Sequence, residues 1–96
     1  MKFEWDDHKE AINREKHGIG FGAIEDAEWD VAMTWPDRRK DYGEERFIGY
    51  VPIHGRLHVA VFTERIPIWR LISLRKANAR ERNQYDQAQI RKTNLH

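Results

Sequence analysis

The residues best suited to chemistry lie in one stretch near the C-terminal end, residues 70–85. The stretch begins as an apolar strand and continues as a charged helix. It concentrates the cationic side chains Arg70, Arg75, Lys76, Arg80 and Arg82, with Arg65 just ahead of it. Guanidinium groups match the geometry of phosphate, and helix N-termini present free N–H groups to anions. The stretch therefore indicates a phosphate-binding surface at a strand-to-helix junction.

The charge of the chain is small overall but unevenly distributed. Residues 64–96 hold eight Lys or Arg against three Asp or Glu, whereas residues 1–63 hold nine against thirteen, and the net charge is +1. This asymmetry predicts a basic working end on a balanced scaffold. The alternative is a solvated helix of mixed charge, and charge alone does not separate the two.

Composition excludes several classes of site. The chain has 96 residues, of which 40% are hydrophobic, and it has no cysteine. Disulfides, thiolate zinc sites and cysteine nucleophiles are therefore excluded, and a reducing cytoplasm is the expected location. The acidic N-terminus does not resemble a signal peptide, and the longest apolar run, residues 59–62, is too short to span a membrane.

The chain reads as one α+β domain over residues 1–96. We expect two N-terminal helices, the first capped by Asp6 or Asp7 and ended at Gly18, and the second over residues 21–29. Four strands are expected at 31–35, 45–51, 57–63 and 68–74. Their short connectors, such as His54-Gly55, imply an antiparallel meander. Asn78 and Glu81 have the spacing that caps a third helix. Residues 86–96 form a polar tail that we expect to fray or to become ordered against a partner.

Alternation along each predicted strand divides its side chains between the two faces of the sheet. Leu57, Val59 and Val61 are expected to meet the helices, which leaves His58 and Glu64 on the uncovered face.

The neighbouring strands supply further residues to that face. Arg46, Tyr50, Ser73 and Arg75 are expected on the uncovered side. Arg70 points the other way unless a bulge intervenes, and its expected role is an ion pair at the sheet edge.

Further polar side chains mark the helices. Lys9, Asn13 and Lys16 form a stripe at helical spacing that ends at His17. The stripe could track a nucleic-acid backbone or pair with neighbouring acids in water. No histidine pair has the spacing of a metal site, so no metal and no cofactor are expected. Tyr85 could stack on a base, donate a proton or pack the last helix on the sheet.

Taken in order along the chain, these motifs resemble the BrnT toxin family. The resemblance rests on Phe3-Glu-Trp-Asp6, Lys9, Asn13, Lys16-His17-Gly18, Phe21, Glu45-Arg46, Thr63-Glu64-Arg65, Arg70-x-Ile-Ser-x-Arg-Lys-Ala77, Glu81-Arg82 and Tyr85. It implies a RelE-like fold and a ribonuclease toxin of a type II toxin–antitoxin system, which cleaves RNA without a metal and inhibits translation. It also implies a ribbon-helix-helix antitoxin that neutralises the toxin and binds operator DNA with it.

Cleavage of this kind needs an activated 2′-OH, stabilised phosphorane charge and a protonated leaving oxygen. On the basis of the resemblance, Arg75 and Lys76 are predicted to stabilise charge and Arg46 to hold the flanking phosphate. Three residues stay open as base or acid, namely Glu64, His58 and His17. The tips of Arg46, Glu64 and Arg75 are predicted to share one open face.

RNA contacts are predicted for a wider set of residues: Lys9, Asn13, Lys16, His17, Arg65, Arg82 and Tyr85. The competing hypothesis is a non-catalytic binding module, whose basic C-terminal surface docks an acidic partner.

Overall fold

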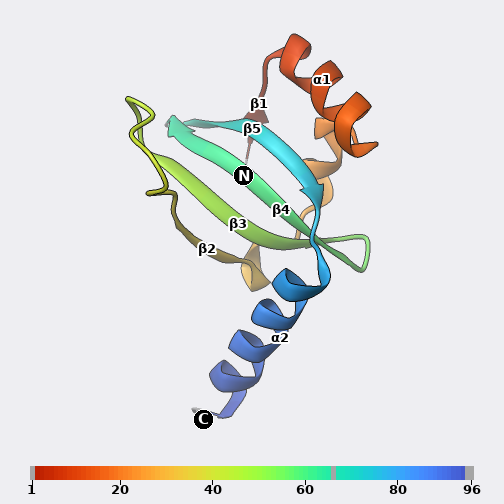
Figure 1. The fold of residues 1–96 in the computed structure, drawn as a ribbon, viewed down its shortest axis with the longest axis vertical. Helices are drawn as coiled ribbons and strands as arrows, with labels where there is room; N and C mark the ends of the chain where they lie inside the picture. Colours follow the sequence, from red (N-terminus) through yellow and green to blue (C-terminus); the bar gives the residue numbers. More distant parts are fainter. Residues whose placement is uncertain (1, 66, 95–96) are drawn as a thin grey trace.

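The computed structural model describes residues 2–65 and 67–94 and has an α+β fold, as predicted. One five-stranded sheet has the order β1-β5-β4-β3-β2 (Figure 1). Its strands are β1 (Phe3–Glu4), β2 (Met33–Pro36), β3 (Arg46–Ile53), β4 (Arg56–Arg65) and β5 (Ile68–Lys76). The α-helices are α1 (Asp7–His17) and α2 (Ala79–Asn94), and two 3₁₀ segments are η1 (Phe21–Asp26) and η2 (Trp29–Val31).

Helix α1 begins and ends where the sequence indicates. The Asp6 carboxylate accepts hydrogen bonds from the backbone N–H groups of His8 (2.8 Å) and Lys9 (3.1 Å), so Asp6 is the cap. These bonds lower the pKa of Asp6. Gly18 adopts φ 70°, a left-handed conformation that favours glycine, and its N–H donates to the carbonyl of Arg14.

The predicted second α-helix over residues 21–29 is wrong. That segment forms η1, followed after a short break by η2. The apolar spacing that suggested a helix is Phe21 to Ile24, and a 3₁₀ turn places residues three apart on one side equally well. Both side chains are buried in the core.

The predicted four-stranded meander is also incomplete. β1 pairs in parallel with β5, through Phe3 with Trp69 and Glu4 with Arg70, so the sheet is mixed. A strand of two residues is too short to show a period, so periodicity could not identify it. The other strands lie close to their predicted ranges and pair antiparallel. The His54-Gly55 hairpin is confirmed, with φ 50° and 73°, which suits a two-residue turn.

The prediction of which face of β4 packs against the N-terminal helical layer is wrong. Ala60 and Phe62 pack with Phe21 and Ile24 of η1, beneath the N-terminal layer. Leu57 and Val59 belong instead to a second cluster on the opposite face, where α2 begins. Both faces of β4 are apolar, so alternation alone could not decide which one the helices cover.

A bulge in β5 changes which arginines share a face. Val61 pairs with Ser73 and Phe62 with Leu71, so Ile72 is an extra residue without a partner across the ladder. Arg70 therefore lies on the same face as Ser73 and Arg75, and the predicted separation of Arg70 from Arg75 is wrong. Its ion pair is confirmed, because Arg70 Nη1 lies 3.4 Å from Glu4 Oε1.

Helix α2 extends away from the sheet (Figure 1). Its start is a capping box, as predicted: Asn78 N–H donates to Glu81 Oε1 (2.9 Å), and Glu81 N–H donates to Asn78 Oδ1 (2.8 Å). The predicted polar tail continues α2 to Asn94, and Leu95 and His96 lie outside the described residues. Fraying of the tail stays a prediction. No described helix is long and apolar enough to cross a membrane.

Candidate functional site

The sheet face opposite the N-terminal layer, called here the arginine face, is built of cross-strand rows. One row holds Arg46, Thr63 and Arg70, and another holds Tyr50, Val59 and Arg75. The two rows lie four positions apart along β4, which corresponds to about 13 Å. Thr63 Oγ1 and Arg46 Nε are buried and have no hydrogen-bond partner among the described residues. The two rows thus place arginine side chains at both ends of the arginine face, with apolar side chains between them.

A hollow of about 290 Å³ lies at the Arg75 end of this face. We call it the arginine hollow. Its lining residues come from β2 to β5, the start of α2 and the loop after β2: Trp35, Arg39, Ile48, Tyr50, Val59, Val61, Ser73, Arg75, Arg80 and Glu81. The hollow therefore combines an apolar floor with converging guanidinium groups.

Arg75 is fixed in the hollow by Glu81. Its Nη1 and Nη2 donate to the two carboxylate oxygens of Glu81 at 2.8 and 2.7 Å. Glu81 is 5% exposed, and the Arg75 guanidinium, followed by the Asn78 N–H, lowers the pKa of that carboxyl. The Glu81 carboxylate in turn raises the pKa of Arg75. Glu81 is thus ionised and its oxygens are occupied, so it positions Arg75 and is unsuited to take up a proton.

Arg39 reaches the same hollow from the loop after β2. Its Nε and Nη2 donate to Asp37 Oδ1 and Oδ2, both at 2.8 Å. The Asp37 side chain is 0% exposed, and the bond from Arg39 lowers its pKa to about 2. The pKa of Arg39 is raised by the same bond. A buried, ionised aspartate therefore fixes the direction of an exposed arginine.

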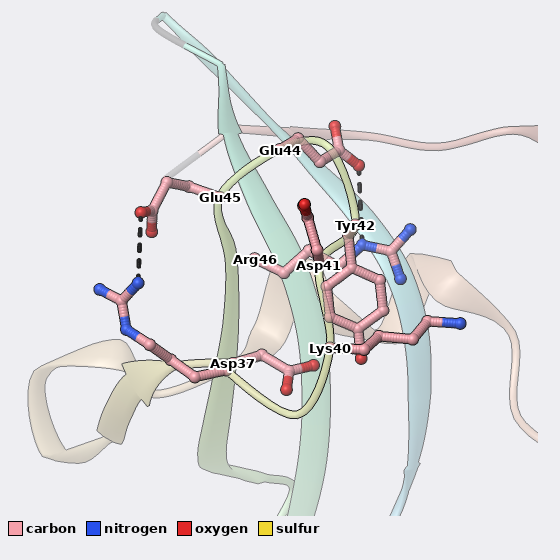
Figure 2. A pocket seen from close by; sticks show the side chains of 8 residues that line it. Asp37, Lys40, Asp41, Tyr42, Glu44, Glu45 and Arg46 are labelled. Carbon is pink, nitrogen blue, oxygen red and sulfur yellow. Dashed lines mark ion pairs between the residues drawn. The ribbon is translucent and has the colours of Figure 1, made fainter.

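The loop that carries Arg39 also forms a larger pocket of about 460 Å³, drawn in Figure 2. Two of its three cations are paired within the pocket, Arg38 with Glu45 at 3.8 Å and Arg46 Nε with Glu44 at 3.6 Å. The Arg46 guanidinium also lies 4.1 Å from the centre of the Tyr42 ring. Because two of the three cations are already paired and the acidic side chains outnumber the cations, this pocket offers little to a phosphate, and Arg46 is held outside the arginine hollow.

A second hollow, of about 260 Å³, runs between α1 and β5. We call it the α1 hollow, and it is lined by Lys9, Ile12, Asn13, Lys16, His17, Ile72 and Ser73. Asn13 docks α1 on the sheet: its Nδ2 donates to the Leu74 carbonyl (2.7 Å) and its Oδ1 accepts from the Leu74 N–H (3.2 Å). The predicted stripe exists, but the amide of Asn13 is occupied by the backbone.

Ser73 lines both hollows, so the two meet at this residue. His17 lies on the α1 side and Arg75 on the other. Burial lowers the pKa of His17, and the positive charges of Lys16 and Arg75 lower it further. At neutral pH the imidazole is therefore uncharged and able to accept a proton next to fixed cations.

The predicted convergence of Arg46, Glu64 and Arg75 is wrong. Glu64 lies beneath the other face, in a pocket with Phe62 and Trp69, because it follows Phe62 by two residues along β4. Only Arg46 shares the face of Arg75.

His58 and Lys76 also fall on the other side from Arg75, paired across β4 and β5. His58 was expected on the uncovered face, but it is only 3% exposed, and its Nδ1 lies 2.7 Å from the Arg56 carbonyl. Burial lowers its pKa.

The remaining residues predicted to contact RNA are spread over the molecule. Arg65 lies 3.5 Å from Glu44 at the sheet end. Arg82 donates to the Ala77 carbonyl at the start of α2 (3.2 Å). Tyr85 donates to the Val31 carbonyl (2.7 Å) and packs with the Tyr50 cluster, which favours the packing role foreseen for it.

Sequence reasoning missed part of the arginine hollow. Arg39 was not singled out, Arg80 was named only among the cations of residues 70–85, and the capping role was taken as sufficient to explain Glu81. Glu81 had a detectable signal, because its capping box with Asn78 starts α2 directly after the strand that ends in Arg75 and Lys76. Arg39 had none, since its place depends on how the loop folds.

Comparison with protein families matches residues 5–81 to the model described as "Ribonuclease toxin, BrnT, of type II toxin-antitoxin system". The chain belongs to the BrnT family. Comparison with curated proteins finds no match. The BrnT match spans α1, the whole of β2–β5 and the capping box of α2, and so includes both hollows. The family consists of ribonuclease toxins of type II toxin-antitoxin systems. Membership therefore implies RNA as the substrate and an antitoxin as the protein partner.

Proposed function

We propose that this protein is a metal-independent endoribonuclease toxin whose active site lies where the arginine hollow and the α1 hollow meet at Ser73. The observation that carries the proposal is the placement of His17 and Arg75 on either side of Ser73. The phosphate to be cleaved would lie over Ser73, between these two side chains.

Arg75 supplies charge stabilisation in this proposal. Its two terminal nitrogens are held by Glu81, and Nη1 also donates to the Lys76 carbonyl (3.4 Å), which leaves the Nε–H and the outer N–H of Nη2 for phosphate oxygens. Arg39 and Arg80 line the same hollow and add positive charge. No three acidic or histidine side chains among the described residues are grouped to hold a metal ion. In this proposal, guanidinium groups supply the cationic charge offered to the transition state.

His17 is the residue that the geometry favours as base. Neutral His17 accepts the proton of the 2′-OH, and the 2′-oxygen attacks the neighbouring phosphorus. The bond from phosphorus to the 5′-oxygen breaks, and that oxygen takes a proton from water or from the imidazolium. The products are a 2′,3′-cyclic phosphate and a 5′-hydroxyl.

The other basic residues extend the binding surface. Lys9 and Lys16 border the α1 hollow. Arg46 and Arg70 stand about 13 Å from Arg75 along the sheet, and RNA that crosses the face there would have to compete with their ion pairs to Glu44 and Glu4. Lys76, Arg65 and Arg82 lie outside both hollows and are not assigned a catalytic part. The proposal includes a RelE-like relationship, a cytoplasmic location and neutralisation by a ribbon-helix-helix antitoxin that carries operator DNA binding.

The proposal is tested by incubating purified protein with RNA in EDTA and analysing the ends of the products. We expect cleavage to 2′,3′-cyclic phosphate and 5′-hydroxyl ends. In cells, induced expression should arrest growth, and co-expression of an adjacent ribbon-helix-helix gene should relieve the arrest. A folded protein that neither cuts RNA in EDTA nor arrests growth would instead be a binding module.

A further inference from the structure

A fourth pocket, on the face opposite Arg75, has no part in the proposed reaction. We call it the aromatic pocket. It has a volume of about 300 Å³ and is lined by Trp29, Thr34, Phe47, Phe62, Glu64 and Trp69. Four of its six side chains are aromatic and one is a carboxylate. This size falls at the lower end of pockets that hold small ligands or single side chains.

The aromatic side chains form one packed group around Phe62. The Phe62 ring centre lies 5.4 Å from Trp29, 5.8 Å from Phe47 and 5.3 Å from Trp69. Phe62 itself is 2% exposed, so it forms the floor, while the other three rings are only partly buried. The walls are therefore rigid aromatic surfaces that a ligand can reach.

Glu64 gives the pocket its charge. Among the described residues it has no ion-pair partner, and the cations nearest to it along the chain are engaged elsewhere. Arg65 pairs with Glu44 at 3.5 Å, and Arg70 pairs with Glu4 at 3.4 Å. The negative charge at the pocket is thus uncompensated.

Aromatic faces attract cations, and they do so more strongly when a carboxylate lies beside them. A phosphate would be repelled by Glu64. A guanidinium fits best, since it is flat enough to stack on a ring and has paired N–H groups for a carboxylate.

We infer that the aromatic pocket binds an arginine side chain of the antitoxin. The identity of this partner rests on the proposed function. The pocket lies on the other face of the sheet from Ser73, so an antitoxin segment that occupies it would hold the toxin without competing with RNA for the same groups.

The inference is tested by titrating N-acetyl-arginine amide into ¹⁵N-labelled protein and following the indole N–H signals by NMR. We expect saturable shifts at Trp29 and Trp69. Trp5 and Trp35 serve as internal controls, because neither lines the pocket. The neutral analogue N-acetyl-citrulline amide should give no saturable shift. Glu64→Gln should weaken arginine binding about fivefold, the upper range for an exposed ion pair. The matched variant Glu45→Gln should leave it unchanged.

Three results would overturn the inference: no saturable shift with the arginine compound, equal shifts with citrulline, or no effect of Glu64→Gln. Saturable shifts of the same indoles with guanosine monophosphate instead would make the pocket an RNA-base site. Adding the protein from an adjacent ribbon-helix-helix gene should shift the Trp29 and Trp69 signals, and unchanged signals in the complex would refute the choice of partner. These readouts are independent of RNA cleavage, so a failed pocket and a failed ribonuclease are distinguishable.

Discussion

Substituting Arg75 with alanine should lower both the free energy of unfolding and the rate of RNA cleavage, and a second substitution can separate the two effects. Arg75 donates two short bonds to Glu81, whose side chain is 7% exposed. Removing the arginine leaves a buried carboxylate without its partner, which costs about 3–5 kcal/mol in a fully buried pair. The Arg75 side chain is 37% exposed, so water can partly replace it, and we expect a loss of about 2–3 kcal/mol.

This loss should leave the variant folded. A domain of 96 residues has a free energy of unfolding of about 5–14 kcal/mol. We expect Arg75→Ala to lower Tm by about 10–20 °C while urea denaturation stays cooperative. Cleavage should fall by about 10²–10³, the usual loss when one group that stabilises transition-state charge is removed.

The second substitution, Glu81→Gln, separates the two effects. In the double variant the buried charge is gone, and glutamine can keep the capping box with Asn78. We expect the Arg75→Ala, Glu81→Gln protein to regain about half of the lost stability and none of the lost activity. Cleavage by the double variant within about tenfold of wild type would refute the role of Arg75. Equal stability of the single and double variants would refute the buried pair.

Three further predictions follow from the same geometry. Replacing His17 with glutamine should lower kcat/KM by about 10²–10⁴. Because burial lowers the pKa of His17, wild-type kcat/KM should fall only as the pH drops below 6.5. The variant should not show this fall at low pH, and a variant that still shows it would contradict the assignment of His17 as the base. Asn13→Ala should lower the free energy of unfolding, measured by urea denaturation, by about 2–4 kcal/mol, because it leaves buried backbone groups unpaired. The control Asn83→Ala, on exposed α2, should lower it by less than about 0.5 kcal/mol. A loss under about 1 kcal/mol for Asn13→Ala would be inconsistent with its role in docking α1 on the sheet. Asp37→Asn should cost about 1–2 kcal/mol at pH 7, allowing for the exposure of Arg39. The folded pKa of Asp37 is about 2 against 3.8 ordinarily, so the wild-type advantage is full above pH 4 and disappears as pH falls through 2; an advantage that persists below pH 2 would refute the pair.

Local signals in the sequence located most of the elements. The Asp6 cap, the Gly18 stop and the Asn78–Glu81 capping box each depend on residues close together in the chain, and all were found in the structure. β1 and the 3₁₀ segments were missed, because two residues show no period and i, i+3 spacing does not distinguish a 3₁₀ turn from an α-helix.

The faces of the sheet were harder to predict than its strands. A single bulge at Ile72 moved Arg70 onto the face of Arg75, and nothing in the local sequence marks that extra residue. β4 is apolar on both sides, so the covered face was reversed, and His58 and Glu64 were placed wrongly with it. Arg75 and Ser73 were assigned to the uncovered face and both line the arginine hollow, whereas His17, one of three residues left open as base or acid, lines the α1 hollow.

The central claim is that RNA lies over Ser73, between His17 and Arg75. The most direct measurement is NMR mapping of the labelled protein with a 2′-O-methyl RNA oligonucleotide, which cannot be cleaved at its 2′-oxygens. Our account predicts saturable shifts at His17, Ser73 and Arg75, with Glu64 and Trp69 unchanged. Shifts confined to Glu64 and Trp69, or no saturable shift in the folded protein, would contradict it.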